Sequence, residues 1–313
     1  MDHRSDRIGS RIKLRDLRVL MAIADSGSMA KAAAKLGISH PAVSKTISDV
    51  EGMLGVRLLD RGSQGTELTA HGEVLLRCGI NIFDEMQQGL RSLEYLSDPN
   101  VGEVRLGCTD IIMNSLVPPI VRRFSKEHPN VQLDVKLANP GEHQIQQLRE
   151  RRIDLLITRA TGPQEDFHSE ALFEEPFVFV VGAKSEFSRN RRITLKDIMK
   201  SNWVLPSYDS APGALVAAVF QANGLEPPKP LVKTIAIQLT VSLIASGEFV
   251  GILPRSVAAL SAHQAALRIL PLKYSGPRIS AEIVYLENRT LSPAVNAFIR
   301  CARQVTTSLV RKY

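Results

Sequence analysis

Residues 28–54 constrain the fold of this chain more than any other stretch, because their pattern predicts two short helices joined by a tight turn. The first helix, Met29–Leu36, follows Ser28, which can cap a helix N-terminus, and precedes Gly37, a residue type typical of helix ends in a left-handed conformation. Small side chains on one face should allow close contact with a neighbouring helix: Ala30, Ala33 and Ala34. Such a pair needs a third helix to complete a hydrophobic core.

The second helix of the pair is expected to start after Ser39 and to carry Pro41 in its first turn, where the missing backbone N–H costs nothing. Apolar residues at helical spacing predict one buried stripe: Val43, Ile47, Val50 and Leu54. The other face carries short or cationic side chains that suit a polyanion: Ser39, His40, Pro41, Ser44, Lys45 and Ser48. A helix-turn-helix unit places such a face in the DNA major groove, whereas an ordinary helical hairpin would leave it in water.

The flanking sequences favour DNA binding over the ordinary hairpin. Upstream, a helical face predicts the third helix of the unit: Leu17, Leu20, Met21 and Ala24. Downstream, two short segments flank Gly62-Ser63-Gln64-Gly65 and predict a hairpin, or wing. Four cations are expected to hold DNA phosphates: Arg57 and Arg61 in the wing region, and Lys31 and Lys35 on the first helix of the pair.

The motifs between Leu17 and Gly72 resemble the DNA-binding domain of LysR-type transcriptional regulators. The matching parts are S-x-P-A-x-S-[RK]-x-I at Ser39–Ile47, L-G-V-x-L at Leu54–Leu58, Arg61, and L-T-x-x-G at Leu68–Gly72. One departure is Leu59, where the family usually has Phe. The resemblance implies a winged helix-turn-helix domain, residues 14–69, that binds double-stranded DNA at an inverted-repeat operator.

Residues 70–97 contain no proline and predict one long helix after this domain. Apolar side chains fall at a and d positions of a heptad: Leu76, Phe83, Met86, Leu90 and Leu93. A core helix could show the same pattern, but a long helix leaving a small domain is better explained as a dimer coiled coil. The resemblance implies the same: a linker helix that joins chains into a dimer or a tetramer.

From residue 101 onward, strands and helices alternate and predict a parallel βαβαβ unit followed by a second α/β set. The fold class expected for the whole chain is therefore α/β, with an all-α winged helix-turn-helix domain at the N-terminus. Two lobes are expected, lobe I from 101–160 and 268–313 and lobe II from 162–267, with crossings near Arg159–Gly162 and Leu267–Leu272. Residues 1–13 are interpreted as a flexible basic arm.

The second part, residues 101–313, resembles the effector-binding domain of the same family, which has a periplasmic-binding-protein-like fold. The matching pieces are VRLG at Val104–Gly107, L-V-P-P at Leu116–Pro119, I-D-L-L-I at Ile153–Ile157 and L-S-P-A at Leu291–Ala294. The runs Asn202–Ser210 and Gly251–Ala258 are similar to the branch typified by galactose-binding-protein regulators. A departure is Arg151, where the family often has Gly at a helix end; a left-handed conformation there would cost about 1 kcal/mol.

Ligands of open α/β sheets bind at the carboxyl ends of strands, where helix N-termini also point. From lobe I the residues expected to line the cleft are Thr109, Asp110, Ile111, Asn139, Pro140, Thr158 and Arg159, and from lobe II Ser207, Tyr208, Asp209, Ser210, Ile237 and Gln238. Each alone could equally be a loop residue that caps the next helix. Asp110 and Asp209 favour a polyhydroxylated or amine-bearing effector, because carboxylates accept hydrogen bonds.

Other classes of protein find less support in the sequence. The 313 residues carry a net charge of +7, which makes a polyanionic partner plausible, and contain no common hydrolase, metalloprotease or nucleotide-binding motif. No catalytic set, metal site or cofactor is therefore predicted. The three cysteines are expected to be small core residues. No apolar run reaches about 18 residues, and the N-terminus lacks the apolar core of a signal peptide, so a cytoplasmic protein without membrane contact is expected.

The expected function is that of a homo-oligomeric regulator of transcription whose DNA contacts change when a small molecule enters the cleft. Two alternatives remain at this point. A solute-binding protein would account for the second half but has no use for the first. An enzyme with an attached regulatory domain would need a catalytic constellation in the cleft.

Overall fold

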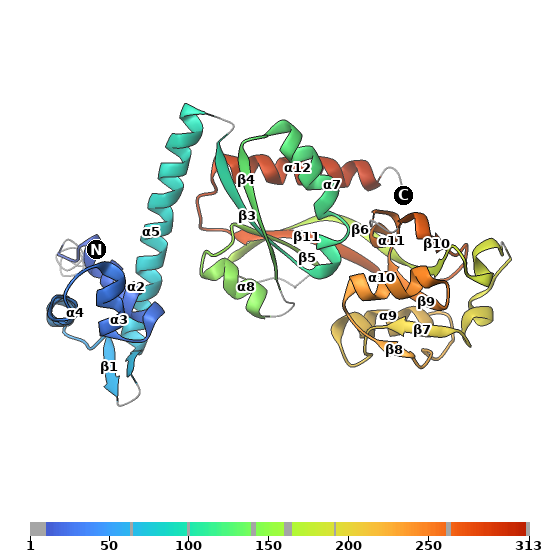
Figure 1. The fold of residues 1–313 in the computed structure, drawn as a ribbon, viewed down its shortest axis with the longest axis horizontal. Coiled ribbons are helices and arrows are strands. Elements are labelled where there is room, and N and C mark those ends of the chain that lie inside the picture. Colours follow the sequence, from blue (N-terminus) through green and yellow to red (C-terminus); the bar gives the residue numbers. More distant parts are fainter. Residues whose placement is uncertain are drawn as a thin grey trace. The chain divides into compact units, whose positions relative to one another are not determined.

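The structure is a computed structural model, and it describes residues 11–62, 65–98, 101–138, 142–159, 165–190, 192–260 and 264–310. The chain divides into two compact units, Met1–Leu90 and Arg91–Tyr313. Figure 1 shows the elements of both. Most of the predicted N-terminal arm, residues 1–10, lies outside the described residues.

The first unit is a three-helix core with a hairpin. Its elements are α2 (Leu14–Ser26), α3 (Met29–Leu36), α4 (His40–Leu54), β1 (Leu59–Gly62), β2 (Gly65–Leu68) and the first part of α5 (Ala70–Ser97). The strands β1 and β2 pair antiparallel, as predicted for the wing. Gly37 ends α3 at a φ of 66°, and the Ser39 hydroxyl accepts a hydrogen bond from the Ala42 amide at the start of α4. The predicted stripe of α4 is confirmed for Val43, Ile47 and Val50, which are buried, while Leu54 is half-buried against the same core.

Two faces in this core differ from the prediction. Helix α3 buries Met29, Ala32 and Ala33, while Ala30 and Ala34 are exposed. The buried face of α3 includes Met29, because burying this larger side chain removes more apolar area from water than burying an alanine does. Helix α2 buries a second face besides the predicted one (Val19, Ala22 and Ile23), because it packs against α3 and α4 on one side and against Gly79 of α5 on the other. Ser28 stands at the N-cap of α3 but makes no capping bond with its side chain.

The junction between the hairpin and α5 explains the L-T-x-x-G motif. The Thr69 hydroxyl donates to the Arg57 carbonyl at 2.7 Å and accepts from the Gly72 amide at 3.1 Å, so it caps α5 and holds the hairpin base. A Cβ atom on Gly72 would lie 2.1 Å from the Leu58 carbonyl oxygen, a distance that no side chain tolerates. The Glu51 carboxylate completes this junction by accepting from the Leu58 and Leu59 amides.

The second unit contains two sheets that share one strand. Its strands are β3 (Gly102–Cys108), β4 (Val131–Leu137), β5 (Leu155–Arg159), β6 (Phe167–Gly182), β7 (Asn202–Leu205), β8 (Val232–Lys233), β9 (Phe249–Pro254), β10 (Leu267–Ile269) and β11 (Arg278–Leu286). The strand order is β4-β3-β5-β11-β6-β9-β7-β8, with β10 paired to β6. The pairs β3–β4 and β3–β5 are parallel, as the predicted βαβαβ unit requires.

Helices cover both faces of each sheet. They are α6 (Asp110–Met113), α7 (Val117–Glu127), α8 (Glu142–Arg149), α9 (Ala211–Gln221), α10 (Ile237–Ser246), α11 (Arg255–Leu260) and α12 (Pro293–Val310), with short 3₁₀ helices at Glu186–Arg189, Leu195–Ile198 and Gln264–Ala266. Alternate residues of β5 show the arrangement: Leu155 and Ile157 pack under α7 and α12, while Leu156 packs under α8. In the second sheet, α9 covers one face and α10 with α11 the other (Figure 1).

Strand β6 is longer than the sequence pattern indicates. A strand was expected only over Phe177–Val181, but pairing with β11 already starts at Phe167 and continues to Pro176. From Phe177 onward the same strand pairs with β9 in the second sheet. The chain therefore crosses from one sheet to the other at Pro176–Phe177, and not near residue 160. The first half of β6 contains polar residues and a proline, so its sequence does not show the pattern of a buried strand.

Two of the three cysteines are buried. Cys108 and Cys301 are buried as expected, and burial raises the pKa of the Cys108 thiol to about 12 and that of Cys301 to about 11. Cys78 on α5 is exposed, so the prediction of a core position was wrong for it. Among the residues that the structure describes, no helix is both long and apolar enough to cross a bilayer.

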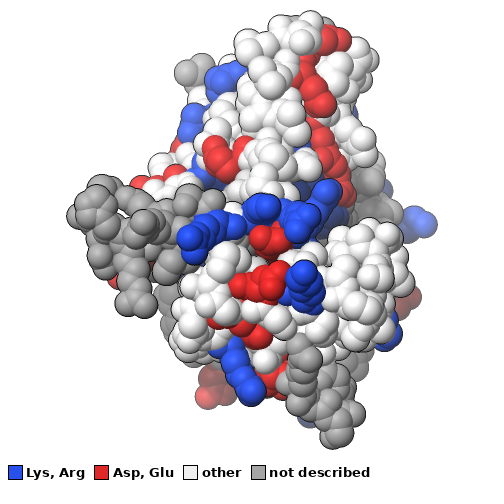
Figure 2. Space-filling view, turned by 90° about the vertical axis from the view of Figure 1, so that its left-hand side faces the viewer, with Lys and Arg blue, Asp and Glu red and all other residues white. Residues whose placement is uncertain are grey.

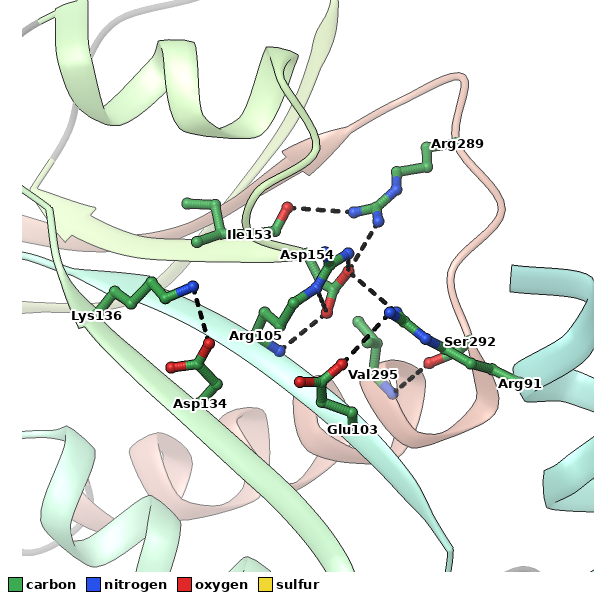
Figure 3. Close-up of polar contacts among 10 residues, drawn as sticks. All are labelled: Arg91, Glu103, Arg105, Asp134, Lys136, Ile153, Asp154, Arg289, Ser292 and Val295. Carbon is green, nitrogen blue, oxygen red and sulfur yellow. Dashed lines mark hydrogen bonds and ion pairs between the residues drawn. The ribbon is translucent and has the colours of Figure 1, made fainter. Parts of the chain in front are cut away.

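A cluster of charged side chains around Asp154 ties together separate segments of the second unit (Figure 3). The buried Asp154 carboxylate accepts from the Arg105 amide at 2.9 Å and from its guanidinium Nη2 at 2.6 Å. Arg289, which has no exposed side-chain area, donates to the same carboxylate at 2.8 Å. Arg91, on the last turns of α5, lies 3.8 Å from Asp154 and 3.3 Å from Glu103.

This cluster makes the stability of the second unit depend on pH. Burial alone would raise the pKa of Asp154, but the hydrogen bond from Arg105 and the charges of Arg105 and Arg289 outweigh it and hold the pKa below its ordinary value. A carboxyl whose pKa is lowered on folding stabilises the fold above its unfolded pKa, and this contribution is lost as the pH falls through the folded pKa.

We predict that Asp154→Asn lowers the free energy of unfolding at neutral pH by about 3–5 kcal/mol, because buried arginines lose their shared partner. The variant should also lose part of the decline in stability that the wild type shows in acid. Urea denaturation across a pH series, followed by the fluorescence of the single tryptophan, Trp203, in the core of the second sheet, measures both effects. If the stability of the variant fell in acid as steeply as that of the wild type, Asp154 would not be the source of the pH dependence.

Arg151, two residues after α8 ends at Arg149, has a left-handed conformation with φ at 55°, which is the conformation whose cost the sequence analysis considered. A Cβ atom is strained there, so Arg151→Gly should raise the free energy of unfolding of the second unit by about 1 kcal/mol. Arg151→Ala serves as the matched control, because it removes the same side chain but keeps the Cβ. Equal stability of the two variants in chemical denaturation would show that strain at this position is negligible.

Candidate nucleic-acid interface and ligand cavity

The polar face of α4 is open to solvent in the first unit. Four of its predicted DNA-contacting residues on the helix are exposed and one, Ser44, is half-buried: His40, Pro41, Ser44, Lys45 and Ser48. Ser39, also exposed, caps the helix N-terminus. Within the described part of the chain, Lys45 makes no ion pair, so its ammonium group is available to a base edge or a phosphate. The buried stripe on the opposite side fixes the direction in which this face points.

The cations predicted to hold phosphates do not form a uniform group. Arg57 and Lys31 are exposed and, within the described residues, form no ion pair. Lys35 is paired with Asp25 and would have to leave it to reach DNA. The side chain of Arg61 lies outside the described residues. In the view of Figure 2, Lys and Arg gather beside Asp and Glu, so the surface seen there carries mixed charge.

Helix α5 carries a row of exposed apolar side chains. Their exposed fractions are 39% for Ile82, 43% for Met86, 51% for Leu90, 62% for Leu93 and 79% for Leu96. Two members of the predicted heptad serve the first unit instead. Leu76 packs against its core, and Phe83 lies under the Arg18 guanidinium, 6.0 Å from the ring centre. The free row therefore starts later in the helix than the heptad prediction implies.

A cavity of about 1040 Å³ lies in the second unit, where residues of both sheets meet. Several predicted effector contacts line it: Thr109, Asp110, Ile111, Thr158, Arg159 and Ile237. Asn139 and Pro140 lie outside the described residues. Five predicted residues do not line the cavity: Ser207, Tyr208, Asp209, Ser210 and Gln238. Their neighbours Pro206, Ala211 and Pro212 do.

Local hydrogen bonds explain why the segment after β7 misses the cavity. The Ser210 hydroxyl caps α9 by accepting from the Gly213 amide and donates to the Ser207 carbonyl. The Tyr208 hydroxyl donates to the Pro228 carbonyl, and burial raises the pKa of Tyr208 to about 12. Asp209 is exposed, and a hydrogen bond from Ser207 lowers its pKa. The helix-capping alternative is therefore confirmed for Ser210, while Tyr208 and Asp209 bond to Pro228 and Ser207.

The residues that sequence reasoning missed are mainly apolar. They include Leu137, Ile145, Leu215, Ile235, Ile252 and Ile279, besides Gln144, Gln146, Arg149 and Thr234. They were missed because the prediction considered residues at the ends of strands and chose mainly polar ones. The exposure of Leu137, Leu215 and Ile235, at 52%, 41% and 60%, is the structural sign that they face an open cavity.

The polar groups of the cavity already have partners inside the protein, with a few exceptions. The Asp110 carboxylate accepts from the Ile237 amide at 2.8 Å and from the Asn114 side chain at 2.8 Å. Arg159 donates to Glu175 at 2.7 Å; burial lowers the pKa of this arginine, against the opposite effect of Glu175. Of the two carboxylates on which the expected hydroxyl-rich or amine-bearing ligand was based, Asp110 lines the cavity and Asp209 does not.

Comparison with known proteins identifies both units. Residues 14–73 match the model of the bacterial regulatory helix-turn-helix protein, lysR family, and residues 97–307 match the LysR substrate binding domain. The chain is 25% identical over 309 residues to the HTH-type transcriptional regulator GbpR of Azospirillum brasilense, covering 97% of this chain and 89% of that protein.

Solved structures share the fold. A full-length OxyR variant from Pseudomonas aeruginosa matches with a TM-score of 0.66 at 20% identity over 95% of each chain. Full-length CbnR in complex with its target DNA matches with a TM-score of 0.56 at 20% identity over 94% of this chain and 100% of that one. The relatives it matches are named as regulators of transcription and not as enzymes. The chain therefore belongs to the LysR family of DNA-binding transcriptional regulators, with a helix-turn-helix domain and an effector-binding domain.

Proposed function

We propose that a small molecule enters the cavity of the second unit and thereby changes how the recognition helix α4 contacts a promoter. The observation that carries this proposal is the cavity of about 1040 Å³ bounded by residues of both sheets. A ligand that binds one arrangement of the two sheets better than another shifts the population towards it. The shift would alter the spacing of two DNA-binding domains in an oligomer. A footprint of the purified protein on the DNA that flanks its own gene, with and without candidate effectors, tests this.

The same footprint across a salt series tests DNA binding itself. Protection of two stretches about one or more helical turns apart, weakening steeply with salt, is expected for a dimer on an inverted repeat. Diffuse protection that candidate effectors never change would contradict the proposal and favour a plain binding role for the second unit.

The proposed DNA-reading surface is the exposed face of α4 together with cations around it. Ser39, His40, Pro41, Ser44, Lys45 and Ser48 would approach the major groove, and Arg57, Arg61, Lys31 and Lys35 would hold phosphates. We propose domain limits at residues 14–69 for the winged domain, 70–97 for the linker helix and 101–313 for the effector-binding domain, and an arm at 1–13. The match to GbpR supports placing this chain in the galactose-binding-protein-regulator branch of the family. A protein that binds chromosomal DNA has to reach it, which supports a cytoplasmic location.

We predict that Lys45→Ala weakens operator binding by about 1–3 kcal/mol if this lysine reads a base edge. Competition binding against random DNA separates the two possible roles: an equal loss on random DNA would reassign Lys45 to the phosphate backbone. Lys126→Ala, an exposed lysine of the second unit, is the control and should change neither affinity.

The exposed apolar row of α5 supports self-association through this helix, as a dimer or as a tetramer built from dimers. Leaving five large apolar side chains in water is costly, and a second copy of the same helix would cover them. Leu90→Glu should therefore dissociate the oligomer, as measured by sedimentation equilibrium. Gln87→Glu introduces the same charge at an exposed position outside the row and should leave the oligomer intact. Dissociation by both variants, or by neither, would contradict the assignment.

A further inference from the structure

We propose that Glu51 is a positioning residue for DNA binding: its carboxylate holds Arg57 at the place from which this arginine contacts a DNA phosphate while α4 lies in the major groove. Glu51 belongs neither to the proposed reading face of α4 nor to the cations proposed to hold phosphates. The inference rests on the proposed function only in taking Arg57 as a phosphate contact.

Residues 55–58 connect α4 to β1, the first strand of the wing, and Glu51 holds both ends of this connection. Its main-chain carbonyl accepts from the Gly55 amide at 2.8 Å, where a left-handed conformation with φ at 72° ends α4. Its side-chain Oε1 accepts from the Leu58 amide at 2.7 Å and from the Leu59 amide at 3.3 Å. The direction in which the chain leaves the recognition helix is therefore set by one residue.

Thr69 holds the same two peptide groups from the other side. The peptide group between Arg57 and Leu58 donates through its N–H to Glu51 and accepts through its carbonyl from the Thr69 hydroxyl at 2.7 Å. The next peptide group, between Leu58 and Leu59, donates to Glu51 and accepts from the Thr69 amide at 3.0 Å. Two consecutive peptide groups are thus clamped between the end of α4 and the start of α5, and Arg57 lies at the edge of this clamp.

The wing has little rigidity of its own. The strands β1 and β2 share four residue pairs, and a two-stranded hairpin is at best marginally stable by itself. Its attachments to the rest of the unit therefore decide where it points. The Thr66 amide attaches it to the turn between α2 and α3 by donating to the Gly27 carbonyl at 3.2 Å, and the clamp attaches it to the recognition helix.

The charge of Glu51 by itself opposes DNA binding. Glu51 lies in the last turn of α4, where the helix dipole disfavours a negative charge, and DNA phosphates would repel it. Its hydrogen bonds offset this cost. Leu58 and Leu59 are buried, at 1% and 4% exposed, so their amides would be unfavourable without an acceptor, and a carboxylate makes the stronger kind of hydrogen bond. Glu51 therefore contributes to DNA binding through geometry.

The domain should stay folded without this carboxylate. Leu58 and Leu59 also belong to the apolar core that they share with the buried stripe of α4. Removing the acceptor should then loosen the position of Arg57 and leave the helices in place.

Fluorescence anisotropy of the full-length protein across a salt series tests the proposal, on random duplex DNA and on the fragment that the footprint identifies. The slope of log affinity against log salt counts phosphate contacts, at about 0.9 for each one. Arg57→Gln should lower the slope by about 0.9 per protomer, equally on both DNAs. Glu51→Leu, which has no acceptor, should lower it by the same amount, and the double variant should lower it no further.

Three further variants separate position from charge and from folding. Glu51→Gln removes the charge but keeps an acceptor, so it should retain the wild-type slope. Glu51→Asp keeps the charge, but its shorter side chain should not reach the two amides, so it should lower the slope; it decides the test if circular dichroism shows that Glu51→Leu is unfolded. Glu73→Leu, the same substitution at an exposed carboxylate of α5, should leave the slope unchanged. A loss in Glu51→Gln or in Glu73→Leu equal to that in Glu51→Leu would attribute the effect to charge and overturn the proposal.

The remaining outcomes separate this inference from the proposed function. If Arg57→Gln lowers the slope while folded Glu51→Leu and Glu51→Asp do not, the phosphate role of Arg57 stands and the inference is wrong. If the losses from Glu51→Leu and Arg57→Gln add in the double variant, Glu51 does not act through Arg57, and the inference is again wrong. If Arg57→Gln leaves the slope unchanged, the proposed phosphate contact is itself wrong and the inference fails with it.

Discussion

The carboxylate of Asp154 joins several separate segments of the effector-binding domain. It joins the start of β5 to β3 through Arg105, to the segment after β11 through Arg289, and to the end of α5 through Arg91. Because it is buried among these cations, its own cost of desolvation is offset only while all of them stay in place. The I-D-L-L-I motif thus combines one charged residue that fastens segments with apolar residues that fill both faces of the sheet.

Much of the fold could be predicted because local rules and tertiary packing agree in it. Rules of helix capping and periodicity predicted the roles of Gly37, Ser39 and the apolar stripe of α4. The tertiary packing buries that same stripe, so the local and the tertiary preferences agree. The predictions failed where local patterns allowed two answers. Alanines occupy both faces of α3, so only the neighbouring helices decide which face is buried, and the polar first half of β6 becomes a strand only beside β11.

The cavity was predictable in position but not in detail. Strand ends after β3 and β5 placed Thr109, Asp110, Thr158 and Arg159 correctly on its wall, since parallel strands end at one edge. The turn after β7 could not be predicted, because its serines and aspartate suit both ligand binding and helix capping, and here Ser210 caps α9. The hydrogen-bond partners of these side chains could not be predicted either. No sequence pattern shows that the Asp110 carboxylate contacts the N-terminus of α10, 127 residues further along the chain.

The position of β11 affects the order in which the parts of the chain can fold during synthesis. This strand, Arg278–Leu286, lies between β5 and β6 in the first sheet, so that sheet has a gap until nearly the whole chain has been made. The first unit is complete by Leu90. The roughly 200 residues in between take about 10–40 s to translate at about 5–20 residues per second. During that interval the nascent chain carries a DNA-binding domain whose effector domain cannot yet close its sheet, and Arg91 still lacks the Asp154 cluster that Arg289 completes.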